Sequence, residues 1–105
     1  MHDELFQVLA EPRRRAIVEA LRARELAVHA LVDAIGLHQS GVSRHLGILL
    51  ASGFVQVRAE GSQRLYALRP ERFRELATWL GRYRSMWERR EVRRRDRRTK
   101  ARSRA

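Results

Sequence analysis

The middle of the chain reads Gly36-Leu37-His38-Gln39-Ser40-Gly41-Val42-Ser43-Arg44-His45-Leu46-Gly47-Ile48-Leu49-Leu50. A glycine that can end one helix is followed by a second helix with two different faces. Apolar residues recur at helical spacing and predict a buried face, formed by Val42, Leu46, Leu49 and Leu50. Polar residues gather toward the helix start on the other face, namely Gln39, Ser40, Ser43 and Arg44.

The polar front of this helix has two interpretations. A helix that enters the major groove of DNA needs hydrogen-bonding side chains near its N-terminus, because those residues must reach base edges. An ordinary amphipathic helix presents a solvated polar face of the same appearance. The stretch alone leaves both interpretations open, and the flanking sequence has to separate them.

The composition narrows the class of protein. The chain has 105 residues, no cysteine and a formal net charge of +11. This length predicts one compact domain with a thin core, which pairing with a second copy would strengthen. The lack of cysteine excludes disulfides and thiolate metal sites. The sequence contains no signal-peptide pattern and no membrane-spanning run, so we expect a cytoplasmic protein without a membrane partner.

The positive charge is concentrated at one end of the chain. Residues 88–105 hold ten of the 23 basic residues and three of the 12 acidic ones. Excess positive charge indicates a polyanion partner, and nucleic acid is favoured over an anionic membrane surface. We expect a folded domain over residues 1–90 and an arginine-rich extension, helical or disordered, over residues 91–105. The extension would add non-specific DNA affinity or act only as a solubilising tail.

Two short helices are predicted before the central stretch. Residues 3–9 form the first, and residues 12–23 form the second, which begins at a proline. The arginines at 13–15 oppose the dipole of the second helix, which indicates either a phosphate contact or an ion pair to another subunit. The first helix carries an apolar stripe too large for it to bury alone, formed by Leu5, Phe6 and Leu9.

A helix-turn-helix is predicted around the central glycine. Residues 24–26 form a connection, and residues 28–35 form a short helix whose apolar face points inward. Gly36 can adopt the left-handed conformation that ends a helix. Two helices joined by a turn of three or four residues with a glycine match a helix-turn-helix by spacing.

A two-stranded hairpin follows the second helix of this pair. Residues 54–58 alternate apolar and polar, residues 60–63 form a glycine-containing turn, and residues 64–68 form the return strand. A hairpin directly after a helix-turn-helix is a wing, whose tip commonly lies along the phosphate backbone. Residues near the tip favour this interpretation over a solvated turn, namely Arg58, Ser62, Gln63 and Arg64.

The last predicted helix begins at Pro70 and continues to about Arg89. Its apolar residues cover a wider arc than one domain would bury, although the alternative places all of them in the core of a single chain. Together with the first helix, this helix predicts a two-fold dimer. The residues expected at the dimer interface are Leu5, Phe6, Leu9, Trp79, Tyr83, Met86 and Trp87.

This order of elements resembles the ArsR-type winged-helix transcriptional repressors. Residues 9–15 are similar to the family's pattern at the start of a helix, and residues 39–46 are similar to its recognition helix. Residues 53–55 and 64–68 match the start of the wing and its return strand. Residues 79–90 look most like the last helix of the metal-independent autorepressor subgroup. The resemblance implies a mainly α-helical winged helix-turn-helix with one β-hairpin, in the order α-α-α-α-β-β-α, that dimerises through its first and last helices.

Two residues depart from the family pattern. His38 stands where a serine or threonine usually caps the recognition helix, and a neutral histidine caps poorly. Gly41 stands where a larger or β-branched residue is usual, so we expect one base contact to be absent. Both departures alter the expected operator preference and leave the fold intact.

These observations predict a dimeric repressor that binds double-stranded DNA. Dimer symmetry implies an imperfect palindrome with half-sites about one helical turn apart, and repression would follow from occlusion of a promoter. The alternative is an architectural or protein-interaction module with non-specific nucleic-acid binding. The residues expected to contact DNA are Gln39, Ser40, Gly41, Ser43, Arg44, His45, Arg58, Ser62, Gln63 and Arg64. For His45 the alternative is that it packs beside the turn.

Neither a metal site nor a catalytic site is predicted. The resemblance places residues 25–31 where metal-sensing relatives carry two cysteines and an aspartate, and all three are absent. His29 alone does not complete a zinc site, which needs four ligands. No serine pairs by spacing with a histidine and an acid. We therefore expect no cofactor and no enzymatic activity.

Overall fold

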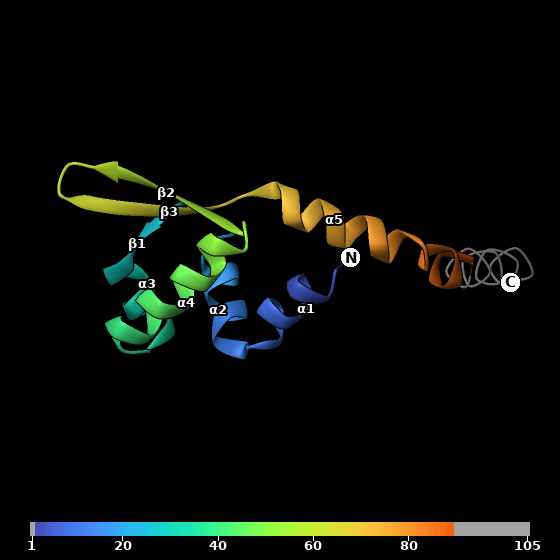
Figure 1. Cartoon of the computed structure of the whole chain (residues 1–105), viewed down its shortest axis with the longest axis horizontal. Helices are drawn as coiled ribbons and strands as arrows, with labels where there is room; N and C mark the ends of the chain where they lie inside the picture. Colours follow the sequence, from blue (N-terminus) through green and yellow to red (C-terminus); the bar gives the residue numbers. More distant parts are fainter. Residues whose placement is uncertain (1, 90–105) are drawn as a thin grey trace, which may run out of the picture. The chain divides into compact units, whose positions relative to one another are not determined.

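The structure is a computed structural model that describes residues 2–89. Two compact units are present, one ending at Glu75 and the other beginning at Leu76. The arginine-rich extension predicted over residues 91–105 lies outside the described residues. The helices and strands are α1 (Asp3–Ala10), α2 (Pro12–Ala20), β1 (Leu26–Ala27), α3 (Val28–Ile35), α4 (Gln39–Ala51), β2 (Val55–Glu60), β3 (Gln63–Leu68) and α5 (Pro70–Gly81) (Figure 1).

The core of the first unit forms where α2, α3 and α4 pack on one another, and α4 also packs on β2. Burial of each large apolar side chain stabilises the folded state by roughly 1.5–3 kcal/mol relative to leaving it exposed. Phe73 of α5 packs edge-on against the buried Phe54, with ring centroids 5.3 Å apart. The predicted buried face of α4 is confirmed, with Leu50 half-buried. The largest fully buried side chains are Ile17, Leu31, Val42, Leu46, Leu49, Phe54 and Val55.

Helices α3 and α4 form the predicted helix-turn-helix. Gly36 ends α3 with a φ of 75°, and its N–H donates to the Val32 carbonyl over 2.8 Å. Glycine adopts this left-handed conformation without steric cost, which explains the residue at the turn. Helix α4 begins at Gln39, directly after His38, whose side chain makes no capping hydrogen bond, as expected.

The sheet has three strands, where the sequence predicted two. Leu26, predicted within a connection, joins Ala27 in strand β1, which pairs antiparallel with β3 to give the order β1-β3-β2. The prediction was wrong because a two-residue strand is too short to show alternation. The added strand pairs with an edge of β3 that a two-stranded hairpin would leave open. It also ties the hairpin to the start of α3.

The wing is the hairpin of β2 and β3 (Figure 1). Its strands pair as far as Glu60 opposite Gln63, which leaves a two-residue turn of Gly61 and Ser62. Both strands are longer than predicted, because Glu60 and Gln63 were assigned to the turn. Gly61 has a φ of 60°, and a glycine at the first position of a two-residue turn matches the twist of the flanking strands.

The last helix is shorter than predicted. Helix α5 ends at Gly81, residues 82–83 form a turn, and residues 84–89 are helical again. The N–H of Arg82 donates to the Trp79 carbonyl over 3.2 Å, a bond one residue shorter than in an α-helix. The continuous helix predicted to about Arg89 was therefore wrong. Glycine has a low helix propensity, which explains a break after position 81.

Helix α1 buries a different face from the predicted one. Leu5 and Val8, three residues apart, are buried in the first unit, whereas Leu9 is half-buried and Phe6 is 41% exposed. Leu5 is therefore withdrawn from the predicted dimer interface, because its own domain covers it. The prediction rested on the larger apolar side chains of this helix and did not include Val8.

Candidate nucleic-acid interface

Helix α4 presents an exposed polar face opposite its buried one. Within residues 2–89, Arg44 makes no hydrogen bond or ion pair, so its guanidinium can bind an external acceptor. Short polar side chains and an arginine near a helix start are the residue types that reach base edges. The residues exposed in the first two turns are Gln39, Ser40, Ser43 and Arg44.

Gly41 lies between this polar face and the core. It is half-buried, and a Cβ at this position would lie 3.2 Å from the side chain of Leu37, in the turn before α4. A larger residue would push Leu37 away from its present position. Glycine therefore keeps the turn close against the helix, and the helix front carries one side chain fewer.

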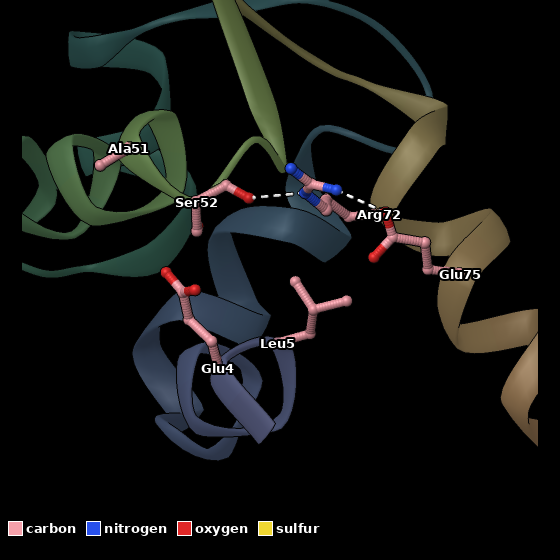
Figure 2. Close-up of a pocket in the computed structure, with 6 residues that line it drawn as sticks. All are labelled: Glu4, Leu5, Ala51, Ser52, Arg72 and Glu75. Carbon is pink, nitrogen blue, oxygen red and sulfur yellow. Dashed lines mark hydrogen bonds and ion pairs between the residues drawn. The ribbon is translucent and has the colours of Figure 1, made fainter. Parts of the chain in front are cut away.

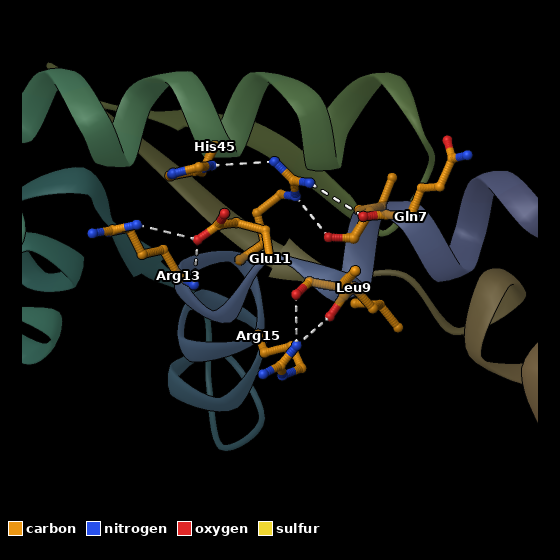
Figure 3. Close-up of polar contacts among 9 residues, drawn as sticks. Gln7, Leu9, Glu11, Arg13, Arg15 and His45 are labelled. Atoms are coloured by element: carbon orange, nitrogen blue, oxygen red, sulfur yellow. Dashed lines mark hydrogen bonds and ion pairs between the residues drawn. The ribbon is translucent and has the colours of Figure 1, made fainter.

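His45 lies inside the domain, so of its two predicted roles the structure favours packing, and the predicted DNA contact has to be corrected. Only 4% of the residue is exposed, and its Nδ1 atom lies 3.4 Å from a guanidinium nitrogen of Arg14 (Figure 3). The sequence contained the signal for this burial. His45 follows Val42 by three residues and precedes Leu49 by four, a spacing that places it on the buried face of α4.

Burial lowers the pKa of the His45 imidazole, because the charged form loses solvation. The positive charges of Arg44 and Arg14 lower the pKa further, and the Glu11 carboxylate partly opposes them. The neutral ring can accept a hydrogen bond from Arg14, whereas a protonated ring would repel it. The folded state therefore favours neutral His45.

This preference predicts a loss of stability in mild acid. Because the pKa of His45 is lower in the folded state than in the unfolded state, the unfolded state binds more protons below about pH 6.5. The contribution of neutral His45 to the free energy of unfolding is complete above that pH. It falls as the pH drops toward the pKa of His45 in the folded state. We expect the free energy of unfolding, measured with urea from pH 7.5 to 5.0, to decrease over this window.

The variant His45→Gln should flatten this pH dependence, and His29→Gln should not, because His29 is exposed. A decrease that is equally steep in both variants would assign the effect to other groups.

Two arginines of α2 bind the last turn of α1 (Figure 3). Arg14 donates to the carbonyls of residues 7–8 over 3.3 and 2.6 Å, and Arg15 donates to those of residues 9–10 over 2.7 and 3.0 Å. A helix end leaves its last four carbonyls without intrahelical partners, and cations there complement the helix dipole. Through the contact with His45, Arg14 also joins α1 to α4.

The arginines at 13–15 therefore have partners within the chain, where the sequence suggested a phosphate or another subunit. Arg13 pairs with Glu11 at 3.4 Å, and the same carboxylate accepts the Arg13 backbone N–H over 3.2 Å, which caps α2. This backbone hydrogen bond is the main reason that the pKa of Glu11 is lowered.

The two wing arginines lie on opposite faces of the hairpin. Side chains alternate along a strand, and directly opposed residues share a face. The register places Arg64 on the face of the buried Val55 and Tyr66, and it places Arg58 on the other face. Because α4 packs against β2, Arg64 lies on the side of the hairpin that faces the helices.

Arg58 forms ion pairs with two carboxylates. Its guanidinium makes a two-point ion pair with Glu25, including an Nε–Oε2 distance of 3.0 Å, and a further pair with Glu60 at 3.3 Å. The hydrogen bond to Glu25 is the main reason that the pKa of Arg58 is raised and that of Glu25 is lowered. A phosphate would have to displace Glu25, so the predicted role of Arg58 in DNA contact is not carried forward.

The wing tip keeps the other predicted residues available. Ser62, Gln63 and Arg64 are all exposed, and Arg64 makes no hydrogen bond or ion pair within the described part of the chain. A free guanidinium beside a hydroxyl and an amide supplies the charge and hydrogen bonds that a phosphate backbone accepts.

A polar cavity of about 220 Å³ lies beside the end of α4 (Figure 2). Arg72 donates from Nε to the Ser52 carbonyl over 3.1 Å and pairs with Glu75. The arginine thereby joins the end of α4 to the start of α5, a contact that the sequence analysis missed because the partners are 20 residues apart. The lining residues are Glu4, Leu5, Ala51, Ser52, Arg72 and Glu75.

Known proteins share this arrangement. A model of the arsR family of bacterial regulatory proteins matches residues 11–57, which span α2 to β2. The transcriptional regulator Rv2034 of Mycobacterium tuberculosis is 38% identical over 81 residues, which cover 77% of this chain and 76% of that protein. The chain belongs to the ArsR family.

Two further relatives bear on this ArsR-family chain. The transcriptional repressor SmtB of M. tuberculosis is 48% identical over 65 residues, which cover 62% of this chain and 48% of SmtB, so the chain spans about half of that repressor. The homodimeric winged helix-turn-helix DNA-binding domain of Mb0332 from Mycobacterium bovis is 28% identical, with a TM-score of 0.64. That likeness covers 81% of this chain and 80% of the other, and it confirms the predicted winged helix-turn-helix fold.

The family assignment covers the helix-turn-helix and the start of the wing. Relatives of this ArsR-family chain are transcriptional regulators, a class that is generally not enzymatic. Within residues 2–89, no three His, Asp or Glu side chains lie close enough together to hold a metal ion. None of the helices described is both long and apolar enough to cross a bilayer.

Proposed function

We propose that this ArsR-family chain is a dimeric, sequence-specific DNA-binding repressor that acts by occluding a promoter. The observation that carries the proposal is the exposed front of α4, where Arg44, which has no partner within residues 2–89, shares a face with Ser40 and Ser43. These side chains offer the donors and acceptors that read base edges in the major groove. The transcriptional regulators among its relatives support the same function.

The proposed DNA contacts divide between two elements. The front of α4 enters the major groove, where Arg44 is the candidate for a guanine contact and Gly41 allows close approach of the helix. The wing tip meets the phosphate backbone through Arg64 and its neighbours. The full proposed set is Gln39, Ser40, Gly41, Ser43, Arg44, Ser62, Gln63 and Arg64.

The repressor is further proposed to work without cysteine-based metal sensing. The chain has no cysteine, and thiolates are the ligands of many ArsR-type metal sensors. The sequence of residues 79–90, similar to that of the metal-independent autorepressor subgroup, supports this assignment.

The proposed dimer uses apolar side chains that the second unit leaves exposed. Tyr83, Met86 and Trp87 are 42%, 66% and 45% exposed, and Leu80 is 50% exposed. A cluster of this kind marks a protein–protein interface more often than a free surface. The related Mb0332 domain is homodimeric, which supports a second copy of this chain as the partner and hence a palindromic operator.

A charge placed among these apolar side chains should break the dimer. The variant Trp87→Glu is expected to raise the dimer dissociation constant by at least about 30-fold, equivalent to about 2 kcal/mol, because buried tryptophans dominate interface energies. Sedimentation velocity at micromolar concentration measures the change. Ser85→Glu adds the same charge to an exposed polar site nearby and should leave the dimer intact. A wild-type chain that sediments as a monomer at this concentration would contradict the dimer.

The function is tested by selecting bound duplexes from a random pool, with the full chain and with a chain lacking residues 91–105. A repressor should enrich one palindrome with half-sites about one helical turn apart and prefer it over random DNA by about 10³-fold or more. The ten basic residues in the last 18 positions favour one alternative, an architectural module. That module would enrich no sequence, and its binding would disappear with residues 91–105.

A further inference from the structure

The ion pair between Glu25 and Arg58 links edge strand β2 to the residue before β1, the other edge strand. Two guanidinium nitrogens of Arg58 face the two carboxylate oxygens of Glu25, an arrangement that fixes orientation as well as distance. Glu25 directly precedes β1, and Arg58 belongs to β2, while β3 lies between these strands. The register aligns Arg58, Leu65 and Ala27 in one row, so the arginine side chain crosses β3 to reach its partner.

The outer part of the wing has few other anchors. After Val55, every residue of β2 is exposed, and the first two residues of β3 are exposed as well. Two strands on their own are marginally stable in water. A side-chain bond from Arg58 to the residue before β1 therefore restrains the hairpin at mid-length, and β1 leads directly into α3.

The charges around Arg58 do not favour a phosphate. Arg58, Glu25 and Glu60 together carry a net charge of −1, and the carboxylates already accept the guanidinium hydrogens. Arg64, on the opposite face, has no such competitor within the described residues. The wing thus separates an arginine held by the protein from an arginine free to bind an anion.

We infer that Glu25 is a positioning residue for DNA binding, which holds Arg58 as a strut and so sets the angle at which the wing tip meets the DNA backbone. This inference rests on the proposed repressor function. The strut keeps Ser62, Gln63 and Arg64 at a fixed place relative to α4, so the wing does not have to be ordered at the moment of binding.

The variant Glu25→Gln should change operator affinity in opposite directions in two cases. In one case Glu25 holds Arg58 as a strut, and in the other Glu25 competes with DNA phosphate for Arg58. If Arg58 were a phosphate contact restrained by Glu25, the variant would free it, make the chain more positive and raise affinity. For a strut, affinity should fall by about five- to tenfold despite the added positive charge. Glu60→Gln removes the same charge without breaking the link across β3 and should leave affinity unchanged or slightly higher.

Rescue and solution dynamics complete the test. The double variant Glu25→Arg/Arg58→Glu restores the net charge and an inverted pair, and it should recover most of the affinity that Arg58→Glu loses. Hydrogen exchange of the amides of Gln63–Leu68 should rise in Glu25→Gln and not in Glu60→Gln. Unchanged or increased affinity of Glu25→Gln, with unchanged exchange, would overturn the inference. If no operator is selected at all, the proposed function fails, while the exchange data still test the strut.

Discussion

Replacing Arg44 by alanine should lower the preference for the selected operator over random DNA by about 5- to 150-fold, equivalent to about 1–3 kcal/mol. Arg44 is exposed on the front of α4 and makes no hydrogen bond or ion pair within residues 2–89. One arginine can donate two hydrogen bonds to a single guanine, and alanine offers no substitute. The unfolding free energy should change little, because the residue lies outside the core.

The matched control is Arg22→Ala, which removes the same charge from another exposed position, where Arg22 pairs with Glu19 at 3.3 Å. This variant should weaken binding to operator and random DNA by the same small factor. Competition binding at one salt concentration measures both affinities. If Arg44→Ala also weakens both DNAs equally, Arg44 contributes only charge, and the proposed base contact is wrong.

Truncating the buried face of the same helix should affect the fold before it affects recognition. Leu46 is 1% exposed, at the centre of the core shared by α2, α3 and α4. Leu46→Ala removes apolar contacts and leaves a cavity, so we expect a loss of about 2–5 kcal/mol in the free energy of unfolding. A typical domain has about 5–15 kcal/mol in total, so the variant should lose a large fraction of its stability.

Ile48→Ala provides the comparison on the other side of α4, because Ile48 is 37% exposed. The decrease in the free energy of unfolding should stay below about 1 kcal/mol, as is usual for surface substitutions. Urea unfolding followed by far-ultraviolet circular dichroism gives both values from the midpoints, provided that the slopes agree. Equal losses in the two variants would mean that α4 does not bury the face assigned to it.

Hydrophobic spacing predicted burial with unequal success along the chain. It identified Val42, Leu46 and Leu49 as the buried face of α4, and the structure confirms all three. It left His45 among the DNA contacts, although the residue falls on that face, because residue type was given more weight than position. In α1, large side chains drew attention away from Val8. These errors were avoidable from the sequence.

Other errors were not avoidable, because no local pattern carries the information. Strand β1 has two residues and becomes a strand only because β3 lies beside it. The wing arginines look equivalent in the sequence, yet the exact register places them on opposite faces. A shift of one residue in that register would exchange their environments.

Local sequence patterns were enough to predict the order of the elements, the helix-turn-helix, the hairpin after it and the buried face of α4. Hydrophobic periodicity and turn-forming glycines act over neighbouring positions, so a local pattern suffices for these features. Only the packing of the elements shows which charged side chains within residues 2–89 have partners. Arg14 meets His45 at a separation of 31 residues, and Arg58 meets Glu25 at 33. Such partners depend on which elements pack together. Among the described residues, this packing pairs Arg58 and gives no partner to Arg44 or Arg64.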